Sequence, residues 1–275
     1  MSASASFSYP KTLQIADTSW TMQFASNQVF LGDCHDVLHD WHDCVVDLVY
    51  LDPPFNTGRS HSANNGAYKD IWPNLAAYLA FMHVRLQTIC RVIKPNGSIL
   101  LHCDWRTSHH LRIMLDGLLG EENFVNHLIW SYGLGGSSPR RFARKHDDIL
   151  YYSKSDAYYF DPPMVPATSN RMKGQLKKAT DIIEIPALNN MAHERRGYPT
   201  QKPVALLELL IKACCPPNSV VLDPMCGSGT TLVAATNLDR KYVGIDINPM
   251  AIDLASSRLQ EYRQPTSPQL TAYAK

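Results

Sequence analysis

The sequence predicts an α/β domain with a mostly parallel sheet and helices on both of its faces. Three observations favour this fold. Apolar runs of strand length alternate with stretches of helical period, the runs are apolar along their whole length, and 275 residues suffice for one large core. Val45–Leu51 is the clearest run, because VVDLVYL suits a strand that is covered on both faces.

The expected elements follow from the spacing of apolar residues along the chain. Stretches with a period near 3.6 predict helices, and short apolar runs bounded by turn residues predict strands. The expected helices are Leu75–Ile93, Ser108–Leu119, Val204–Cys214, Gly229–Leu238 and one that starts at Pro249. The expected strands are Val45–Leu51, Ser98–Cys103, Ile149–Tyr152, Ser219–Asp223 and Tyr242–Asp246.

This alternation fails between Tyr132 and Pro199, where glycine, proline and basic residues are frequent. We interpret residues 133–200 as an insertion within one domain that spans residues 1–275. The ends of the chain, 1–10 and 264–275, are expected to be loose tails.

The composition excludes several classes of protein. No apolar run approaches the about 20 residues that span a bilayer, and the first ten residues lack a signal-peptide core. Seven cysteines form no Cys-x-x-Cys pair, which argues against a disulfide framework and a zinc ribbon. The Cys and His residues between Cys34 and Cys44 are interpreted as a solvated helix face and not a metal site. We therefore expect a cytoplasmic, reduced protein without a membrane partner or a metal.

The net charge of +1 indicates no nucleic-acid partner by itself, but the charge is unevenly distributed. Residues 133–202 hold 12 basic and 7 acidic residues, whereas the rest of the chain holds 14 and 18. The densest part is Arg140–His146, where four cations surround one aromatic ring. Charge alone favours a DNA contact and an exposed charged loop equally. In the first case a second basic cluster, at 171–178, would face the same duplex.

The segment Ser219–Thr231 is a buried strand, a tight turn with two glycines, and the start of a helix. Glycine allows a positive φ angle and a close approach of a ligand to the backbone. The turn lacks the Gly-Lys-Ser/Thr ending of a phosphate loop and the third glycine of a dinucleotide site. Its helix N-terminus suits a carboxylate, and Asp246 at the end of the next strand could accept ribose hydroxyls. Together these features predict a nucleoside ligand with an amino-acid tail.

The strand Val45–Leu51 ends in Asp52-Pro53-Pro54-Phe55. Two prolines stop the strand and have no N–H to donate. The Asp52 carboxylate and the neighbouring carbonyls therefore form a corner that only accepts hydrogen bonds. A nucleobase amine fits such a corner, and Phe55 can stack on the base.

Both motifs resemble those of the DNA amino-methyltransferases. Asp-Pro-x-Cys-Gly-Ser-Gly-Thr-Thr with Gly-Ile-Asp looks like their S-adenosylmethionine site, and Tyr198–Pro203 resembles their segment beside the methionine moiety. The resemblance runs from about Phe30 to about Arg258. The order, with Asp-Pro-Pro-Phe before the glycine-rich strand, is similar to the permuted β group of that family. The resemblance implies the Rossmann-like methyltransferase fold, with 133–200 as the target-recognition region.

The resemblance also implies roles for residues. The catalytic set is Asp52, Pro53, Pro54 and Phe55, with Asp52 and the Pro53 carbonyl on the amine of a flipped-out base. The cofactor set is Asp33, Lys202, Asp223, Pro224, Cys226, Gly227, Ser228, Gly229, Thr230 and Asp246. Asp33 serves equally well as the N-cap of a helix over Val37–Trp41. The expected DNA contacts are Arg140, Arg141, Arg144 and Lys145.

The resulting functional prediction is methyl transfer from S-adenosylmethionine to adenine N6 in double-stranded DNA. Cytosine N4 is the first alternative, although its relatives more often begin the motif with Ser in place of Asp52. A protein or RNA amide methyltransferase and an inactive DNA-binding module are alternatives of other classes. The family also suggests a homodimer and a partner restriction endonuclease. No cysteine nucleophile is expected, and His102 is interpreted as a packing residue.

Overall fold

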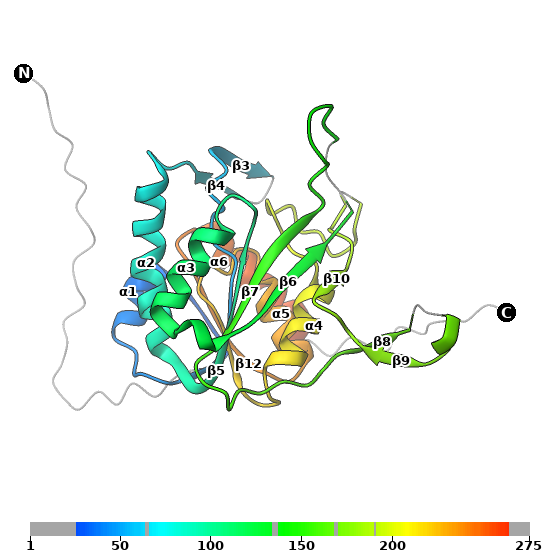
Figure 1. Ribbon diagram of the computed structural model, residues 1–275. Coiled ribbons are helices and arrows are strands. Elements are labelled where there is room, and N and C mark those ends of the chain that lie inside the picture. The colour runs from blue at the N-terminus through cyan, green and yellow to red at the C-terminus, as the bar shows by residue number, and fades with distance from the viewer. Residues whose placement is uncertain (1–25, 64–65, 134–136, 168–169, 190, 264–275) are drawn as a thin grey trace, which may run out of the picture.

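The computed structural model describes residues 26–63, 66–133, 137–167, 170–189 and 191–263, so the tails predicted at 1–10 and 264–275 lie outside it. Its centre is an eight-stranded sheet (Figure 1). In spatial order the strands are β1 (Gln28–Leu31), β12 (Lys241–Asp246), β11 (Val220–Asp223), β2 (Val46–Leu51), β5 (Ile93–Cys103), β7 (His146–Ser153), β6 (Phe124–Ser131) and β10 (Ile182–Glu184). Neighbouring strands from β1 to β5 are parallel, and β7 is antiparallel to both of its neighbours.

Helices cover both faces of this sheet (Figure 1). One layer holds α1 (Cys34–His39), α2 (Leu75–Val92) and α3 (Ser108–Leu119), and the other holds α4 (Val204–Cys214), α5 (Thr230–Asn237) and α6 (Pro249–Arg263). Strand β2 alternates between the two, because Val49 and Leu51 pack in the first core cluster while Leu48 and Tyr50 pack in the second. This two-sided burial is the reason for the continuous apolar strands of the sequence.

The shorter elements lie outside the sheet. They are the hairpin β3 (Arg59–Ala63) and β4 (Gly66–Asp70), the arm β8 (Met164–Pro166) and β9 (Leu176–Lys178), and the 3-10 turns η1 (Glu121–Asn123) and η2 (Asn170–Met172). In Figure 1 the hairpin lies at the top of the molecule and the arm extends from its lower right.

The described helices and strands match the expected α/β alternation, with ends that shift by a few residues. Four strands of the sheet were not expected or were placed elsewhere. Strands β1, β6 and β10 were not expected, and β7 belongs to the central sheet, as β10 does, although both lie within 133–200. Strand β7 is buried from Asp148 to Ser153, so this part of the range contributes to the core. The role of 133–200 in target recognition stays a prediction.

Two smaller expectations also need correction. The helix expected at Val37–Trp41 is α1, which begins three residues earlier. Its face is not wholly solvated, because Cys34 and Leu38 are buried and the His35 ring bonds Thr88 at 2.8 Å. Among the described helices, none is long and apolar enough to cross a membrane.

Candidate active site

A pocket of about 450 Å³ opens at the edge of the sheet where the parallel strands end. Its walls include the residues that follow β1, β2, β11 and β12, so motifs far apart in the sequence meet there. The strands β2 and β11 are direct neighbours, which brings the Asp52 corner beside the glycine-rich turn. The carboxyl edge of a parallel sheet is the usual place for a ligand in such folds.

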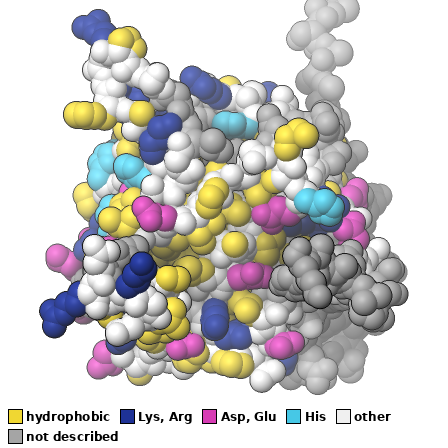
Figure 2. Space-filling model, turned by 90° about the vertical axis from the view of Figure 1, so that its right-hand side faces the viewer, with side chains coloured by type: hydrophobic (Ala, Val, Ile, Leu, Met, Phe, Trp, Pro, Cys, Tyr) yellow, Lys and Arg dark blue, Asp and Glu magenta, His cyan; other side chains and the backbone are white. Residues whose placement is uncertain are grey.

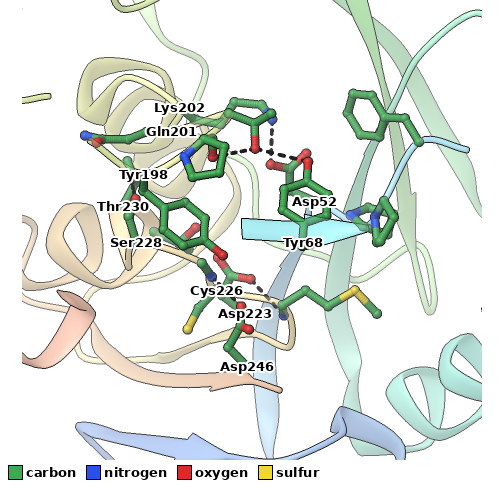
Figure 3. A pocket seen from close by; sticks show the side chains of 18 of the residues that line it. Asp52, Tyr68, Tyr198, Gln201, Lys202, Asp223, Cys226, Ser228, Thr230 and Asp246 are labelled. Atoms are coloured by element: carbon green, nitrogen blue, oxygen red, sulfur yellow. Dashed lines mark hydrogen bonds and ion pairs between the residues drawn. The ribbon is translucent and has the colours of Figure 1, made fainter. Parts of the chain in front are cut away.

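The Asp52 corner holds a buried ion pair (Figure 3). Lys202 Nζ lies 2.5 Å from Asp52 Oδ2 and 5.3 Å from the centroid of the Phe55 ring. The other oxygen, Oδ1, is buried and has no hydrogen-bond partner among the described residues. A buried carboxylate oxygen without a partner costs free energy, so this atom is arranged to receive a donor from a ligand.

The loop after the corner is held by a buried carboxylate, that of Asp70 in β4. Asp70 accepts the backbone N–H groups of Asn56 and Thr57 at 2.8 and 2.9 Å, and the Thr57 hydroxyl at 2.6 Å. This clamp ties the β3–β4 hairpin to the residues that follow Phe55. Tyr68 of the same hairpin lines the pocket and lies 3.3 Å from the Thr200 hydroxyl.

The glycine-rich turn needs its glycines for two different reasons. Gly227 and Gly229 both have positive φ angles, 49° and 75°. A Cβ at Gly229 would lie 2.7 Å from that of Ala255 in α6, and one at Gly227 would lie 3.1 Å from the Tyr198 ring. The bare backbone therefore lets α6 and Tyr198 approach the turn closely.

Asp246 and Asp33 each have a structural partner as well as a place in the pocket wall. Asp246 accepts the Gly227 N–H at 2.8 Å and the Asn248 N–H at 2.8 Å, and burial raises its pKa. Asp33 caps α1 by accepting the His35 N–H at 2.9 Å and pairs with Arg85. The N-cap interpretation of Asp33 is thus confirmed, while its contact with a cofactor stays a prediction.

Arg258 of α6 supports the glycine-rich turn by hydrogen bonds. This role was not expected from the motifs. Its guanidinium is 1% exposed and donates to the Ser228 carbonyl at 2.7 Å and to the Ser228 and Thr230 hydroxyls at 3.2 Å. A signal for this burial exists in the sequence, because Arg258 shares the helical stripe of Ala251 and Ala255. A charged residue on an apolar stripe is normally buried only with partners.

The remaining predicted residues divide by position. Those that line the pocket are Asp33, Asp52, Pro53, Pro54, Phe55, Lys202, Asp223, Pro224, Cys226, Gly227, Ser228, Thr230 and Asp246. Gly229 lies behind them in the turn, and Arg140, Arg141, Arg144 and Lys145 lie outside the pocket. Lining residues that the motifs did not indicate include Tyr68, Arg85, Trp130, Tyr132 and Asp147.

The buried Cys226 and His102 do not suit nucleophilic or general-base roles. Burial raises the pKa of the Cys226 thiol well above its usual value, which keeps it protonated. His102 is fully buried between Tyr50, at 2.6 Å from its Nδ1, and Asp147, at 3.2 Å from its Nε2. His102 therefore acts as a packing residue between these two side chains, as the sequence predicts.

Asp223 is the titratable group of the pocket whose burial has the clearest consequence. Burial raises its pKa from 3.8 to about 7, against the opposing hydrogen bonds of Thr231 and the Met225 N–H. Between about pH 4 and 7 the unfolded chain has lost this proton while the folded protein keeps it. Stability of the cofactor-free protein therefore falls as pH rises through this window.

We expect Asp223→Asn to remove this dependence. The free energy of unfolding of the wild type should drop relative to that of the variant between about pH 4 and 7, by a few kcal/mol at most, since a tenfold change in proton affinity is worth about 1.4 kcal/mol. Urea unfolding of both proteins at several pH values measures the difference. Parallel curves would mean that Asp223 titrates normally.

Comparison with known proteins decides the family. A family model described as DNA methylase matches residues 46–257, most of the chain. The Type II methyltransferase M.HpaI of Haemophilus parainfluenzae is 32% identical over 219 residues, which cover 78% of this chain and 68% of that protein. This chain belongs to the N6/N4 DNA methylase family. The family's amino-methyltransferase chemistry agrees with an acceptor-only corner beside a glycine-rich turn.

Further relatives of this DNA methylase agree with that assignment. The Type II methyltransferase M.ScaI of Streptomyces caespitosus is 27% identical over 257 residues, 86% of this chain and 82% of that protein. Among solved structures, an M1.HpyAVI–SAM complex superposes with a TM-score of 0.61 at 23% identity, over 84% of this chain and 98% of that one. The PvuII cytosine-N4-specific DNA methyltransferase superposes with a TM-score of 0.64 at 16% identity, over 85% and 86%. These superpositions establish a common fold.

The pocket of this DNA methylase fits S-adenosylmethionine. Its volume is in the range of pockets for small ligands, and Gly227, Ser228 and Thr230 of the turn and Asp246 at the end of β12 line it. Figure 3 shows Asp52 and Lys202 on one side of the pocket, and Cys226, Asp223 and Asp246 on another, with Tyr68 and Tyr198 between them. The residues that would hold the cofactor and the amine acceptor thus face a common space.

Proposed function

We propose that this chain transfers a methyl group from S-adenosylmethionine to the N6 amine of adenine in double-stranded DNA. The observation that carries the proposal is the Asp52 corner, where Oδ2 is held by Lys202 and the buried Oδ1 has no partner in the described part of the chain. A neutral amine with two N–H donors satisfies Oδ1 and the Pro53 carbonyl together. A duplex buries its amines in base pairs, so the target base must first leave the stack.

The chain's residues act on the amine through hydrogen bonds. The lone pair of an exocyclic amine is delocalised into the ring, which makes it a poor nucleophile. Hydrogen bonds from its two N–H groups to Asp52 Oδ1 and the Pro53 carbonyl favour the pyramidal form, in which the lone pair is free to attack. When bound, S-adenosylmethionine supplies an activated methyl on its sulfonium. Alignment of the two reactants then provides much of the acceleration.

Different residues bind different parts of the cofactor. The backbone of Gly227–Thr230 and the helix α5 that follows suit a carboxylate, and Asp246 accepts the ribose hydroxyls. Asp33 at the other wall borders the adenine. Lys202 was expected to hold the cofactor; its contact with Asp52 Oδ2 supports a second role, in fixing the carboxylate whose other oxygen, Oδ1, receives the amine.

The choice of adenine over cytosine rests on the motif itself. The fold does not decide it, because the PvuII enzyme of the same fold is cytosine-N4-specific. The Asp-Pro-Pro-Phe-Asn-Thr-Gly sequence resembles adenine-specific members, whereas cytosine relatives more often begin with Ser. Phe55 stacks equally well on either base.

We expect N6-methyladenine as the product. Plasmid DNA treated with the protein and S-adenosylmethionine is digested to nucleosides and analysed by mass spectrometry, and the methylated positions are mapped by sequencing. The Asp52→Ala protein, treated in the same way, is the control for a contaminating activity. N4-methylcytosine as the main product would overturn the choice of base, and the absence of both would overturn the proposed function.

The partners follow from the same proposal. The exposed Arg140, Arg141 and Arg144 and the half-buried Lys145 are proposed to contact DNA, and the type II names of the relatives support a partner restriction endonuclease. Arg144 already lies over the Trp105 ring, with its guanidinium carbon 3.4 Å from the ring centroid. The cluster at 171–178 lies on and beside the β8–β9 arm, away from the β6–β7 loop in Figure 1, and its contact with the same duplex stays a prediction. A homodimer stays a prediction.

A further inference from the structure

The loop between β6 and β7 carries the most exposed of the large apolar side chains in the described part of the chain. Phe142 is 97% exposed, and it is flanked by the exposed residues Arg141 and Ala143. A single exposed apolar residue is common on protein surfaces and needs no explanation by itself. The residues around the Phe142 ring and the position of its loop indicate a function for this side chain.

The loop is attached to the wall of the active-site pocket at both ends. Tyr132 and Asp147 line the pocket on either side of it, and the Tyr132 N–H donates to the Lys145 carbonyl at 3.1 Å. Phe142 is five residues from Asp147, so its backbone lies within about 18 Å of the pocket wall. Figure 1 shows the loop rising above the same end of the sheet as the β3–β4 hairpin.

Three contacts give the loop a defined shape. A bridge joins Ser138 to Arg141, and the Arg140 N–H donates to the Ser138 hydroxyl at 3.4 Å. Arg144 lies over the ring of Trp105, which follows β5. Phe142 therefore stands between a tight turn and a side chain that is stacked on the body of the protein.

The charge around Phe142 identifies the surface that it suits. Four cations lie within three residues of the ring, namely Arg140, Arg141, Arg144 and Lys145. Figure 2 shows basic side chains on the parts that project from this side of the molecule, at its top and at its lower left. An apolar protein surface would leave these cations without anions. A DNA duplex offers apolar base faces bordered by phosphates, which matches an apolar wedge between cations.

We propose that Phe142 enters the base stack of the duplex at the place that the target base leaves. The inference rests on the proposed function, because only base flipping creates such a gap. Flipping exposes the faces of the neighbouring bases and loses their stacking. An aromatic ring that stacks on these faces replaces part of the lost interaction, while the arginines bind the phosphates on either side.

The test compares duplexes that contain the mapped methylation site and differ only opposite the target base. In one duplex the target base is paired. In the other it faces an abasic nucleotide, so no base pair has to be broken before the target base flips out. We expect Phe142→Ala to methylate the paired duplex at least about tenfold more slowly than wild type, in line with the loss of one stacking contact. On the abasic duplex its rate should return to within about threefold of wild type, and Phe142→Trp should be active on both.

Arg141→Ala is the matched control. It removes a neighbouring cation of the same loop, so it should weaken binding to both duplexes equally and lower the log–log salt slope by about 0.9. Unchanged melting temperatures are expected for all variants, since both side chains are exposed. A Phe142→Ala protein that is as active as wild type on the paired duplex, or equally impaired on both, overturns the proposal. Failure of wild type on every duplex would instead overturn the proposed function.

Discussion

The Asp52→Ala variant is expected to lose methyl transfer by about 100- to 1,000-fold, the usual loss when one transition-state hydrogen bond is removed. Alanine takes away the buried Oδ1 that we propose receives the amine. The glycine-rich turn keeps its own contacts, with Asp246 on the Gly227 N–H, so affinity for S-adenosylmethionine should change by less than about threefold. Single-turnover assays measure the transfer, and calorimetry measures the affinity.

Two further variants protect this prediction against a general loss of structure. Asp52→Asn keeps the volume and one oxygen, and it should still be severely impaired because the charge that Lys202 holds is lost. Asp47→Ala is the matched control on the same strand, since Asp47 pairs with Lys94 at 2.9 Å and does not line the pocket. It should lower stability but leave transfer per folded molecule within about threefold. A loss of cofactor affinity in Asp52→Ala without a loss of transfer would assign Asp52 to the cofactor instead.

The second large effect is expected from Arg258→Met, which should weaken the glycine-rich turn of the cofactor site. Methionine fills the space but leaves the Ser228 carbonyl and two hydroxyls without the donors that Arg258 provides. Buried acceptors without partners cost about 1 to 3 kcal/mol each, so we expect the free energy of unfolding to fall by about 3 kcal/mol. We also expect affinity for S-adenosylmethionine to fall at least about tenfold, because the turn loses its support.

Arg240→Met separates the two expected effects of Arg258→Met. The Arg240 guanidinium donates to the carbonyls of Cys215 and Leu238 at the opposite end of β12, outside the pocket. Its loss should lower stability in urea and leave cofactor affinity unchanged. Equal affinities of the two methionine variants would show that Arg258 stabilises the fold without shaping the site.

Much of this site was predictable because its motifs lie at the ends of strands. A continuous apolar run indicates a buried parallel strand, and parallel strands end at the same edge of their sheet. Asp52 and Asp223 could therefore be placed at one edge from local pattern alone, although 170 intervening residues separate them. The positions of Gly227 and Gly229 were predictable for a similar reason, since only glycine takes a positive φ without strain.

Long-range partners could not be predicted in the same way. Local pattern carries no information on which charged residue meets which, so Lys202 was expected at the cofactor and not on Asp52. The same limit applies to Asp70, whose carboxylate organises the loop after Phe55 from another hairpin. In the range 133–200, a strand was expected at Ile149–Tyr152, but local pattern did not show that this strand, β7, lies in the central sheet between β5 and β6.

The sequence by itself determined the strand-and-helix alternation, the glycine-rich turn, and an amine-accepting corner at the end of a buried strand, because each depends on a few adjacent residues. The tertiary structure alone decided which groups complete them. It left Asp52 Oδ1 without a partner among the described residues, buried Arg258 under the turn, and placed the two ends of the Phe142 loop in the pocket wall. These features depend on the packing of segments that are distant in the chain, and burial makes their hydrogen bonds and charges count.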